Sequence, residues 1–347
     1  MKKIKILVTG AGSGVGQSII KALNISKIKC QVISADIDYF NSALFRTKNS
    51  IIVPKVEEPG ALKWYLTNLK KLKINILMIG SEFDINFFSK NKKIIKKKTN
   101  CNICITNSNT IKIADDKYLT QNFLKDNGLP YLKTFKPKTL LEAVKFSKKL
   151  KLPFILKSRF GTSSRNVYLI KKKDDLVSFF YHVKKPILQE HIGSRKNDLK
   201  TEYTCSFFTT KNKEIIGPFI AKRKLVNGTS WIVEVKNNNK IASLIKKIAK
   251  LIDNIGSFNI QLRVNNNGSP IPFEFNPRFS GTTSIRAHFG FNEPEMYIRN
   301  FILGKKINQP IIKKGISFRY IEEIFLDNSS LRDVPKRMGK GKIIKWF

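Results

Sequence analysis

FNIQLRVNNNGSPIPFEFNPRFSGTT, which spans residues 258–283, is the stretch on which the interpretation of this chain depends. It alternates apolar and polar residues over 259–264 and again over 271–275, with a glycine-containing turn between the two runs, which predicts a β-hairpin. Because successive side chains of a strand point to opposite faces, Glu274 and Asn276 share one face. The hairpin therefore presents an acid and an amide together.

Further polar residues of the hairpin join that face. Gln261 projects from the same face of the partner strand and Arg278 follows directly, whereas Phe273 and Phe275 are expected on the opposite, apolar face. A carboxylate with amide oxygens is the oxygen set that Mg²⁺ prefers, and a guanidinium binds phosphate or carboxylate oxygens with two prongs. In isolation the pattern also fits an exposed hairpin with a polar face. The choice between these two interpretations depends on the neighbouring segments.

The composition excludes several classes of protein. At 347 residues and 41% hydrophobic content, the chain is long enough for two or three modules, each with its own core. No apolar run reaches the roughly 18–20 residues that span a bilayer, and the run at 6–8 is too short for a signal-peptide core. We therefore expect a cytoplasmic protein without a membrane partner.

The formal net charge of +40 would suit binding to nucleic acid. The lysines, however, are scattered through every segment, and no aromatic stacking platform lies among them. We expect such a surface to attract small anionic ligands, and we expect no nucleic-acid partner.

The first part of the chain predicts alternating strands and helices, which favours a parallel, doubly wound sheet that binds ligands at the carboxyl ends of its strands. The loop at 10–16 lies at such an end, and it reads T-G-x-x-x-G-x-G from Thr9 onward, with Asp36 about 20 residues further along. This pattern supports one alternative, an NAD(P)-dependent oxidoreductase. A non-catalytic protein that binds nucleotides or nucleic acid is the other.

From residue 109 the pattern changes. A helix predicted over 111–127 carries Lys117, and a strand predicted over 152–159 carries Lys157. This strand ends in a loop of glycine, serine and threonine at 161–167, and such small residues let backbone amides approach an anion closely. The segment thus has the outline of a phosphate-covering hairpin.

In this order and spacing, the string Glu274-Phe275-Asn276-Pro277-Arg278 resembles the E-x-N-P-R signature of ATP-grasp enzymes. The chain is similar to the carbamoyl-phosphate-synthase-like branch of that superfamily, and the resemblance covers residues 3–326. It implies an α/β protein, α+β in the ATP-grasp lobes. The implied parts are a Rossmann-like pre-domain at 1–108, an N-terminal lobe at 109–190, a C-terminal lobe at 191–328 and a basic tail at 329–347.

The resemblance also implies residue roles. Two lysines would contact the ATP phosphates beneath a closing loop, one strand would read adenine, and one acid would hold the ribose. These ATP-binding residues are Lys117, Lys157, Gly161, Ser163, Ser164, Gln189, Glu190, Ile192, Glu202 and Lys222. The implied catalytic residues are Arg223 and Arg278, and the implied metal ligands are Gln261, Glu274 and Asn276. Many relatives carry an acid at the place of Gln261, but the carbamoyl-phosphate-synthase-like branch uses glutamine there.

Residues near the other substrates are expected at the strand ends of the pre-domain and just after the hairpin: Glu82, Asp84, Ser280, Gly281, Thr283 and Arg286. The implied activity is a ligase that joins an amino-acid-like carboxylate to an amine through an acylphosphate, with release of ADP and phosphate. ATP and Mg²⁺, or Mn²⁺ in its place, would be required, and a homodimer is compatible with this activity.

Overall fold

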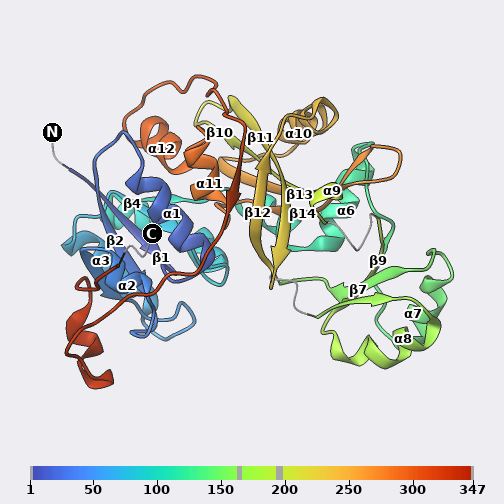
Figure 1. Cartoon of the computed structure of the whole chain (residues 1–347), viewed down its shortest axis with the longest axis horizontal. Coiled ribbons are helices and arrows are strands. Elements are labelled where there is room, and N and C mark those ends of the chain that lie inside the picture. Colours follow the sequence, from blue (N-terminus) through green and yellow to red (C-terminus); the bar gives the residue numbers. More distant parts are fainter. Residues whose placement is uncertain (1–2, 162–165, 193–197, 345–347) are drawn as a thin grey trace.

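The computed structural model describes residues 3–161, 166–192 and 198–344, so Ser163 and Ser164 lie outside the described residues. These residues form one parallel sheet and two antiparallel sheets with helices around them (Figure 1). The α/β class expected from the sequence is confirmed.

The parallel sheet is built from the first part of the chain. Its strand order, β3-β2-β1-β4-β5, is that of doubly wound sheets. The strands are β1 Ile4–Thr9, β2 Cys30–Asp36, β3 Asn49–Ile52, β4 Ile76–Ile79 and β5 Asn102–Cys104. The helices are α1 Gly14–Asn24, α2 Ala43–Arg46, α3 Ala61–Lys71 and α4 Asp84–Thr99. The sequence pattern did not predict α4, because this lysine-rich helix buries only Phe88 and Ile95 fully.

The second sheet has four antiparallel strands in the order β6-β9-β7-β8 and forms a small lobe at the lower right of Figure 1. Its strands are β6 Thr134–Phe135, β7 Phe154–Ser158, β8 Val167–Ile170 and β9 Pro186–Glu190. The helices α7 Leu140–Ser147 and α8 Lys173–Phe179 and the 3₁₀ turn η1 Phe180–His182 accompany it. Leu156 and Leu188 pack in its own core.

The third sheet has six antiparallel strands in the order β14-β13-β10-β11-β12-β15. They are β10 Glu202–Thr209, β11 Ile215–Val226, β12 Thr229–Val235, β13 Gly256–Val264, β14 Pro270–Asn276 and β15 Gly315–Phe318. Its accompanying elements are α9 Asp198–Thr201, α10 Asn239–Leu251, α11 Thr283–His288, α12 Glu293–Tyr297, the π-helical turn η2 Ile298–Ile302 and the 3₁₀ turn η3 Leu331–Arg337.

The predicted hairpin is β13–β14, but one of its faces differs from the prediction. Gln261 pairs with Glu274 and Leu262 with Pro272, so Phe273 is an extra residue in β14. Such a β-bulge changes the alternation of side chains. Phe273 therefore lines the same cavity as Glu274, whereas Phe275 is buried on the other face, as expected.

The single helix expected at 111–127 is wrong, because Asp116 divides it into α5 Ser108–Asp115 and α6 Lys117–Asp126. Asp116 has extended backbone dihedrals, and its carboxylate accepts hydrogen bonds from two backbone amides of α6. Leu124 of α6 packs with Phe258 of the large sheet. These helices therefore share the core of the six-stranded sheet, although the predicted boundaries assign them to the N-terminal lobe.

The pre-domain and the large sheet share one hydrophobic core, in which Ile6 and Val8 pack in a cluster with Phe208, Phe219 and Phe291. The end of the chain also returns to the pre-domain, as Figure 1 shows in red. There the Gly339 amide donates to the Leu44 carbonyl (2.9 Å) and the Gly341 amide to the Phe45 carbonyl (3.1 Å). The segment expected as a basic tail is thus docked on α2, and the late strand expected at 316–326 is only β15.

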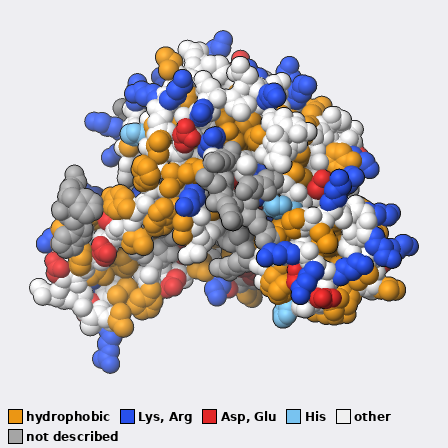
Figure 2. Space-filling model, turned by 45° about the vertical axis from the view of Figure 1, so that its right-hand side comes forward, with side chains coloured by type: hydrophobic (Ala, Val, Ile, Leu, Met, Phe, Trp, Pro, Cys, Tyr) orange, Lys and Arg blue, Asp and Glu red, His pale blue; other side chains and the backbone are white. Residues whose placement is uncertain are grey.

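None of the helices in the described part of the chain is both long and apolar enough to cross a membrane. Figure 2 shows lysine and arginine side chains spread over the visible face of the molecule with few acidic side chains between them. This distribution agrees with the scatter of lysines along the sequence.

Candidate active site

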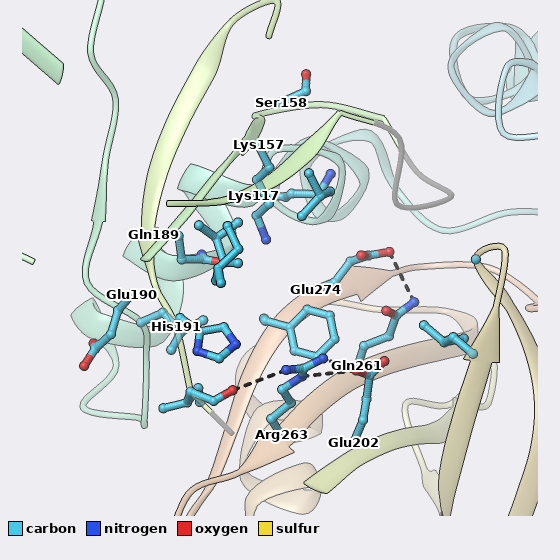
Figure 3. Close-up of a pocket in the computed structure, with 18 of the residues that line it drawn as sticks. Lys117, Lys157, Ser158, Gln189, Glu190, His191, Glu202, Gln261, Arg263 and Glu274 are labelled. Carbon is cyan, nitrogen blue, oxygen red and sulfur yellow. Dashed lines mark hydrogen bonds and ion pairs between the residues drawn. The ribbon is translucent and has the colours of Figure 1, made fainter. Parts of the chain in front are cut away.

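A cavity of about 490 Å³ lies between the small lobe and the six-stranded sheet. Its walls come from β7, β8 and β9 on one side and from β10, β11, β13 and β14 on the other (Figure 3). The cavity therefore collects most of the residues that the sequence assigned to ATP binding, from strands far apart in the chain.

Lys157 enters this cavity from β7 and Lys117 from the start of α6, and both lie above Glu274 in Figure 3. Lys117 is the first residue of α6; its backbone amide donates to the Arg159 carbonyl (3.1 Å), and its ammonium group donates to the Gly161 carbonyl. Arg159 in turn binds the Asp116 carboxylate, with a 2.7 Å bond from Nε. The end of β7 and the start of α6 thus fix Lys117 together.

Lys157 is the more strongly perturbed of the two lysines. Burial, and after it the positive charge of Lys117, lowers the pKa of Lys157 to about 7, although Glu274 acts in the opposite direction. Its ammonium group also lies 5.9 Å from the ring centre of Phe273. A nearby anion such as a phosphate favours the charged form of a buried lysine and would raise this pKa.

Glu274 meets two amides on the opposite wall. One of its carboxylate oxygens accepts hydrogen bonds from Gln261 (3.2 Å) and from Asn276 (3.0 Å). The described residues contain no group of three or more His, Cys, Asp or Glu side chains able to hold a metal ion. What they do contain is one carboxylate with two amide oxygens, and this oxygen set fits Mg²⁺.

Glu202 lies at the floor of the cavity between two arginines. One carboxylate oxygen accepts from Arg223 (2.8 and 3.1 Å) and the other from Arg263 (2.7 and 3.1 Å). Burial alone would raise the pKa of Glu202, but the two guanidinium groups outweigh it and hold the pKa below its ordinary value. All four lone-pair directions are in use in this conformation, in which Glu202 positions the two arginines. Its expected role in holding ribose hydroxyls stays a prediction.

Arg223 and Arg263 each make a further contact, at different ends of the cavity. Arg223 also donates to the side-chain oxygen of Gln261 (2.7 Å), beside the acid of the hairpin. Arg263 also donates to the backbone carbonyl of Ile192 (3.4 Å), at the strand expected to read adenine. Arg263 was not predicted from the sequence, although its position two residues after Gln261 places it on the same face of β13.

The strand expected to bind adenine is β9, and its side chains point to different sides. Gln189 is 2% exposed, lines the cavity and donates to the Thr134 hydroxyl (3.0 Å). Glu190 points away from the cavity in Figure 3 and accepts from the Lys133 amide (3.2 Å). Gln189 and the backbone of Ile192 therefore face the space where a base would lie, while the Glu190 carboxylate does not.

Lys222 was expected beside Arg223 at the phosphates, but it does not line the cavity. Adjacent residues of a strand face opposite sides of the sheet. Arg223 lines the cavity, whereas the Lys222 ammonium group lies 5.9 Å from the ring centre of Tyr203.

Arg278 lies beside a second, smaller cavity of about 50 Å³, which Lys117, Glu274 and Asn276 also line. Its guanidinium group forms an ion pair with Glu82 of the pre-domain and donates to the Phe279 carbonyl (2.8 Å). The small cavity therefore lies between two of the residues expected to bind metal, Glu274 and Asn276, and the ion pair that connects the pre-domain to Arg278.

Asp84 does not share this place with Glu82. It lines a separate cavity of the pre-domain, on the other side of the loop that follows β4. The two acids, which were expected to bind one ammonium group, therefore line different cavities.

The residues after Arg278 are structural in this conformation. Arg286 is completely buried and forms an ion pair with Glu293 (2.9 Å). Gly281 accepts from Ser18 of α1 (3.2 Å). None of the four residues expected at the substrate lines either cavity around Glu274, namely Ser280, Gly281, Thr283 and Arg286.

The glycine loop at 10–16 packs against the protein itself. A Cβ atom at Gly12 would lie 1.6 Å from the side chain of Asn41, which donates to the Asp36 carboxylate (3.1 Å). The same Asp36 oxygen accepts from the Gly12 amide (2.9 Å). In a dinucleotide site this acid would bind the ribose hydroxyls. Since Asn41 occupies that place, the structure does not favour the oxidoreductase alternative.

Comparisons with known proteins bear on the fold and on part of the chain. Residues 199–324 match the family model described as ATP-grasp in the biosynthetic pathway with Ter operon. No curated protein sequence matches this chain.

Three solved structures have a similar fold. The N5-carboxyaminoimidazole synthetase of Staphylococcus aureus, complexed with ADP, superposes with a TM-score of 0.72 at 18% identity, over 92% of this chain and 83% of its own. The biotin carboxylase domain dimer of Hydrogenobacter thermophilus 2-oxoglutarate carboxylase, complexed with MgADP, ADP and bicarbonate, has a TM-score of 0.72 at 13% identity, with coverages of 95% and 81%. The biotin carboxylase–β,γ-ATP complex of Campylobacter jejuni has a TM-score of 0.72 at 15% identity, over 90% of this chain and 74% of its own. By the matched family model and this shared fold, the chain contains an ATP-grasp domain.

Proposed function

We propose that this protein is an ATP-dependent ligase that activates a carboxylate as an acylphosphate and joins it to an amine. The observation that carries the proposal is the arrangement across the 490 Å³ cavity. Lys117 and Lys157 on one wall face Glu274 on the other. Cations and oxygen ligands thus converge at one end of a space whose other end has backbone and amide groups suited to a base.

In the proposed reaction, the carboxylate oxygen of the acid attacks the γ-phosphorus of ATP and ADP leaves. The amine then attacks the acyl carbon, and phosphate and a proton depart. Lys117, Lys157 and Arg223 neutralise phosphate oxygens during the first step. Gln189 and the Ile192 backbone orient the base, and Arg278 stabilises the transferring phosphoryl group from the adjoining small cavity.

Gln261, Glu274 and Asn276 are the residues that would hold magnesium. When bound, Mg²⁺ or Mn²⁺ supplies Lewis-acid polarisation of the phosphate oxygens. Glu202 keeps Arg223 and Arg263 in place, and burial lowers the pKa of Lys157 to about 7, so that this lysine is only partly charged near neutral pH without an anion. Both properties favour a site organised around a polyphosphate.

Amino-acid-like acids and amines remain the proposed substrates, and the carbamoyl-phosphate-synthase-like branch remains the proposed subgroup. Because the similar Hydrogenobacter thermophilus structure is a complex with bicarbonate, bicarbonate belongs in the set of acids to be tested. We also propose a homodimer, since that domain is a dimer; light scattering of the purified protein tests this.

Hydroxylamine provides a test that does not require the natural amine, because it traps acylphosphates as hydroxamates. The protein is incubated with Mg-ATP, hydroxylamine and single acids from a set of amino acids, dicarboxylates and bicarbonate. For bicarbonate, ADP release is measured instead. We expect ADP release that depends on one acid and, for an organic acid, equals hydroxamate formation. ADP release that no acid stimulates would contradict the proposal.

Glu274→Ala separates binding from chemistry. The variant should lose turnover, because its carboxylate is the only one among the proposed metal ligands, while metal-free nucleotide affinity changes little. Glu323→Ala, at an exposed position, is the matched control and should retain full turnover. Substantial activity of Glu274→Ala would remove Glu274 from the metal site.

A further inference from the structure

The pre-domain has a cavity of its own, of about 330 Å³, at the carboxyl ends of β1, β2 and β4. This is the edge at which doubly wound sheets bind ligands. The loop between β4 and α4 separates it from the active site: Ser81, Phe83 and Asp84 line the pre-domain cavity, and Glu82 lines the cavity of Arg278. The two spaces are therefore distinct, with one loop between them.

Three carboxylates, from Asp36, Glu57 and Asp84, line this one cavity. The chain has only 25 acidic residues against 65 basic ones, so such a concentration of negative charge contrasts with the rest of the molecule. Burial is the main cause that raises the pKa of Asp84 to about 6, and the charges of Glu57 and Asp36 add to it. A cationic group in the cavity would relieve this repulsion.

Tyr65 supplies an independent observation. It is 1% exposed and lines the same cavity, with its ring held edge-on by Phe88 at 5.0 Å. Its hydroxyl makes no hydrogen bond to another residue in the described ranges. Because this hydroxyl faces the cavity and has no hydrogen-bond partner among the described residues, it is available to a polar group of a molecule bound there.

Lys55 makes the cavity bipolar. It lies at the exposed side of the same space, two residues before Glu57, and no ion pair joins either side chain to another residue that the structure describes. Phe83, which is 82% exposed, adds an apolar surface at the rim. An anionic and a cationic group of one small molecule would thus both find partners.

We propose that this cavity binds a small zwitterion of the amino-acid class. Its ammonium group lies among Asp84, Glu57 and the Tyr65 hydroxyl, and its carboxylate lies at Lys55. The site is separate from the nucleotide cavity and needs no nucleotide.

Isothermal titration calorimetry of the nucleotide-free protein tests the proposal with each of the twenty standard L-amino acids. We expect at least one of them to bind with a Kd in the millimolar range or tighter, and its N-acetyl derivative, which lacks the ammonium group, not to bind. Binding by none of the twenty overturns the proposal.

Variants then locate the bound amino acid. Asp84→Asn and Glu57→Gln should each weaken binding at least tenfold, and Glu57→Gln, at an exposed position, keeps the test open should Asp84→Asn fail to fold. Asp327→Asn is the matched control at an exposed acid and should leave the Kd unchanged. If Arg278→Lys abolishes binding while Glu57→Gln does not, the ligand occupies the active site, and the proposal is wrong.

Discussion

At the scale of single residues, the surroundings of Arg278 and Lys157 say most about the chemistry. Arg278 forms an ion pair with Glu82. Lys157 lies close to the positive charge of Lys117 and the negative charge of Glu274. One is fixed by an ion pair from another part of the fold, and the other is kept partly neutral by burial. Each arrangement leads to a measurable expectation.

Arg278→Lys keeps the positive charge but loses the planar pair of donors. If Arg278 stabilises charge on the transferring phosphoryl group, kcat should fall by about 10², with little change in KM for ATP. Arg299→Lys is the matched control, since Arg299 forms a half-buried ion pair with Glu295 and lines neither cavity around Glu274. Full activity of Arg278→Lys, or loss of the folded protein, would show that the residue is structural.

Lys157 predicts a pH dependence of nucleotide binding. Its pKa is about 7 in the empty protein, and a bound phosphate raises it, so binding takes up a proton at pH values above 7. Affinity for ATP should therefore fall as pH rises from 7 to 9. Lys157→Arg, which stays charged, should flatten this dependence, and Lys222→Met should leave it unchanged. Calorimetry in buffers of different ionisation enthalpy measures the proton uptake.

At the scale of elements, the break between α5 and α6 decides where Lys117 stands. Asp116 caps α6 and pairs with Arg159, and the backbone of Lys117 is bonded to the end of β7. The bulge at Phe273 acts similarly on the other wall, because it turns an aromatic ring into the cavity beside Glu274. Local departures from regular structure thus shape both walls.

Asp116→Ala removes both the helix cap and the partner of Arg159. The free energy of unfolding should fall by about 1–2 kcal/mol, and KM for ATP should rise because Lys117 loses its support. Asp116→Asn retains a good capping group and should fall between the wild type and the alanine variant. Denaturant unfolding with steady-state kinetics measures both effects. An unchanged KM in Asp116→Ala would mean that Lys117 does not depend on this cap.

At the scale of the whole molecule, the pre-domain is not an independent attachment. It shares a core with the six-stranded sheet, receives the end of the chain on α2 and sends Glu82 to Arg278. The four-stranded lobe, in contrast, has a core of its own. Ligand binding between this lobe and the large sheet should therefore stabilise the molecule as a unit.

Mg-ATP should raise the melting temperature, because it binds the folded state alone; at 100 times Kd the gain is about 2.7 kcal/mol. NADH should have no such effect, since Asn41 and the Gly12 amide occupy Asp36. Differential scanning fluorimetry with both nucleotides makes the comparison. Stabilisation by NADH alone would contradict the assignment of the nucleotide site.

Much of the architecture could be predicted from the sequence, because it depends on local patterns. Alternating strands and helices predicted the parallel sheet, and the hairpin with Gln261, Glu274 and Asn276 was recognised from the period of a strand. Lys117 and Lys157 were predicted from the resemblance to ATP-grasp enzymes. These residues meet in one cavity, but their roles there remain predictions.

Only the tertiary structure shows which charged side chains of distant segments form ion pairs with one another. Glu202 pairs with Arg223 and Arg263, Arg286 is buried against Glu293, and Lys222 faces away from the cavity. Residue types and local spacing cannot reveal these outcomes, because a carboxylate binds whichever cation the fold brings to it. The sequence by itself determined which side chains are available for the chemistry; the packing of three sheets decided which of them face the cavity, since burial and long-range ion pairs depend on the whole fold.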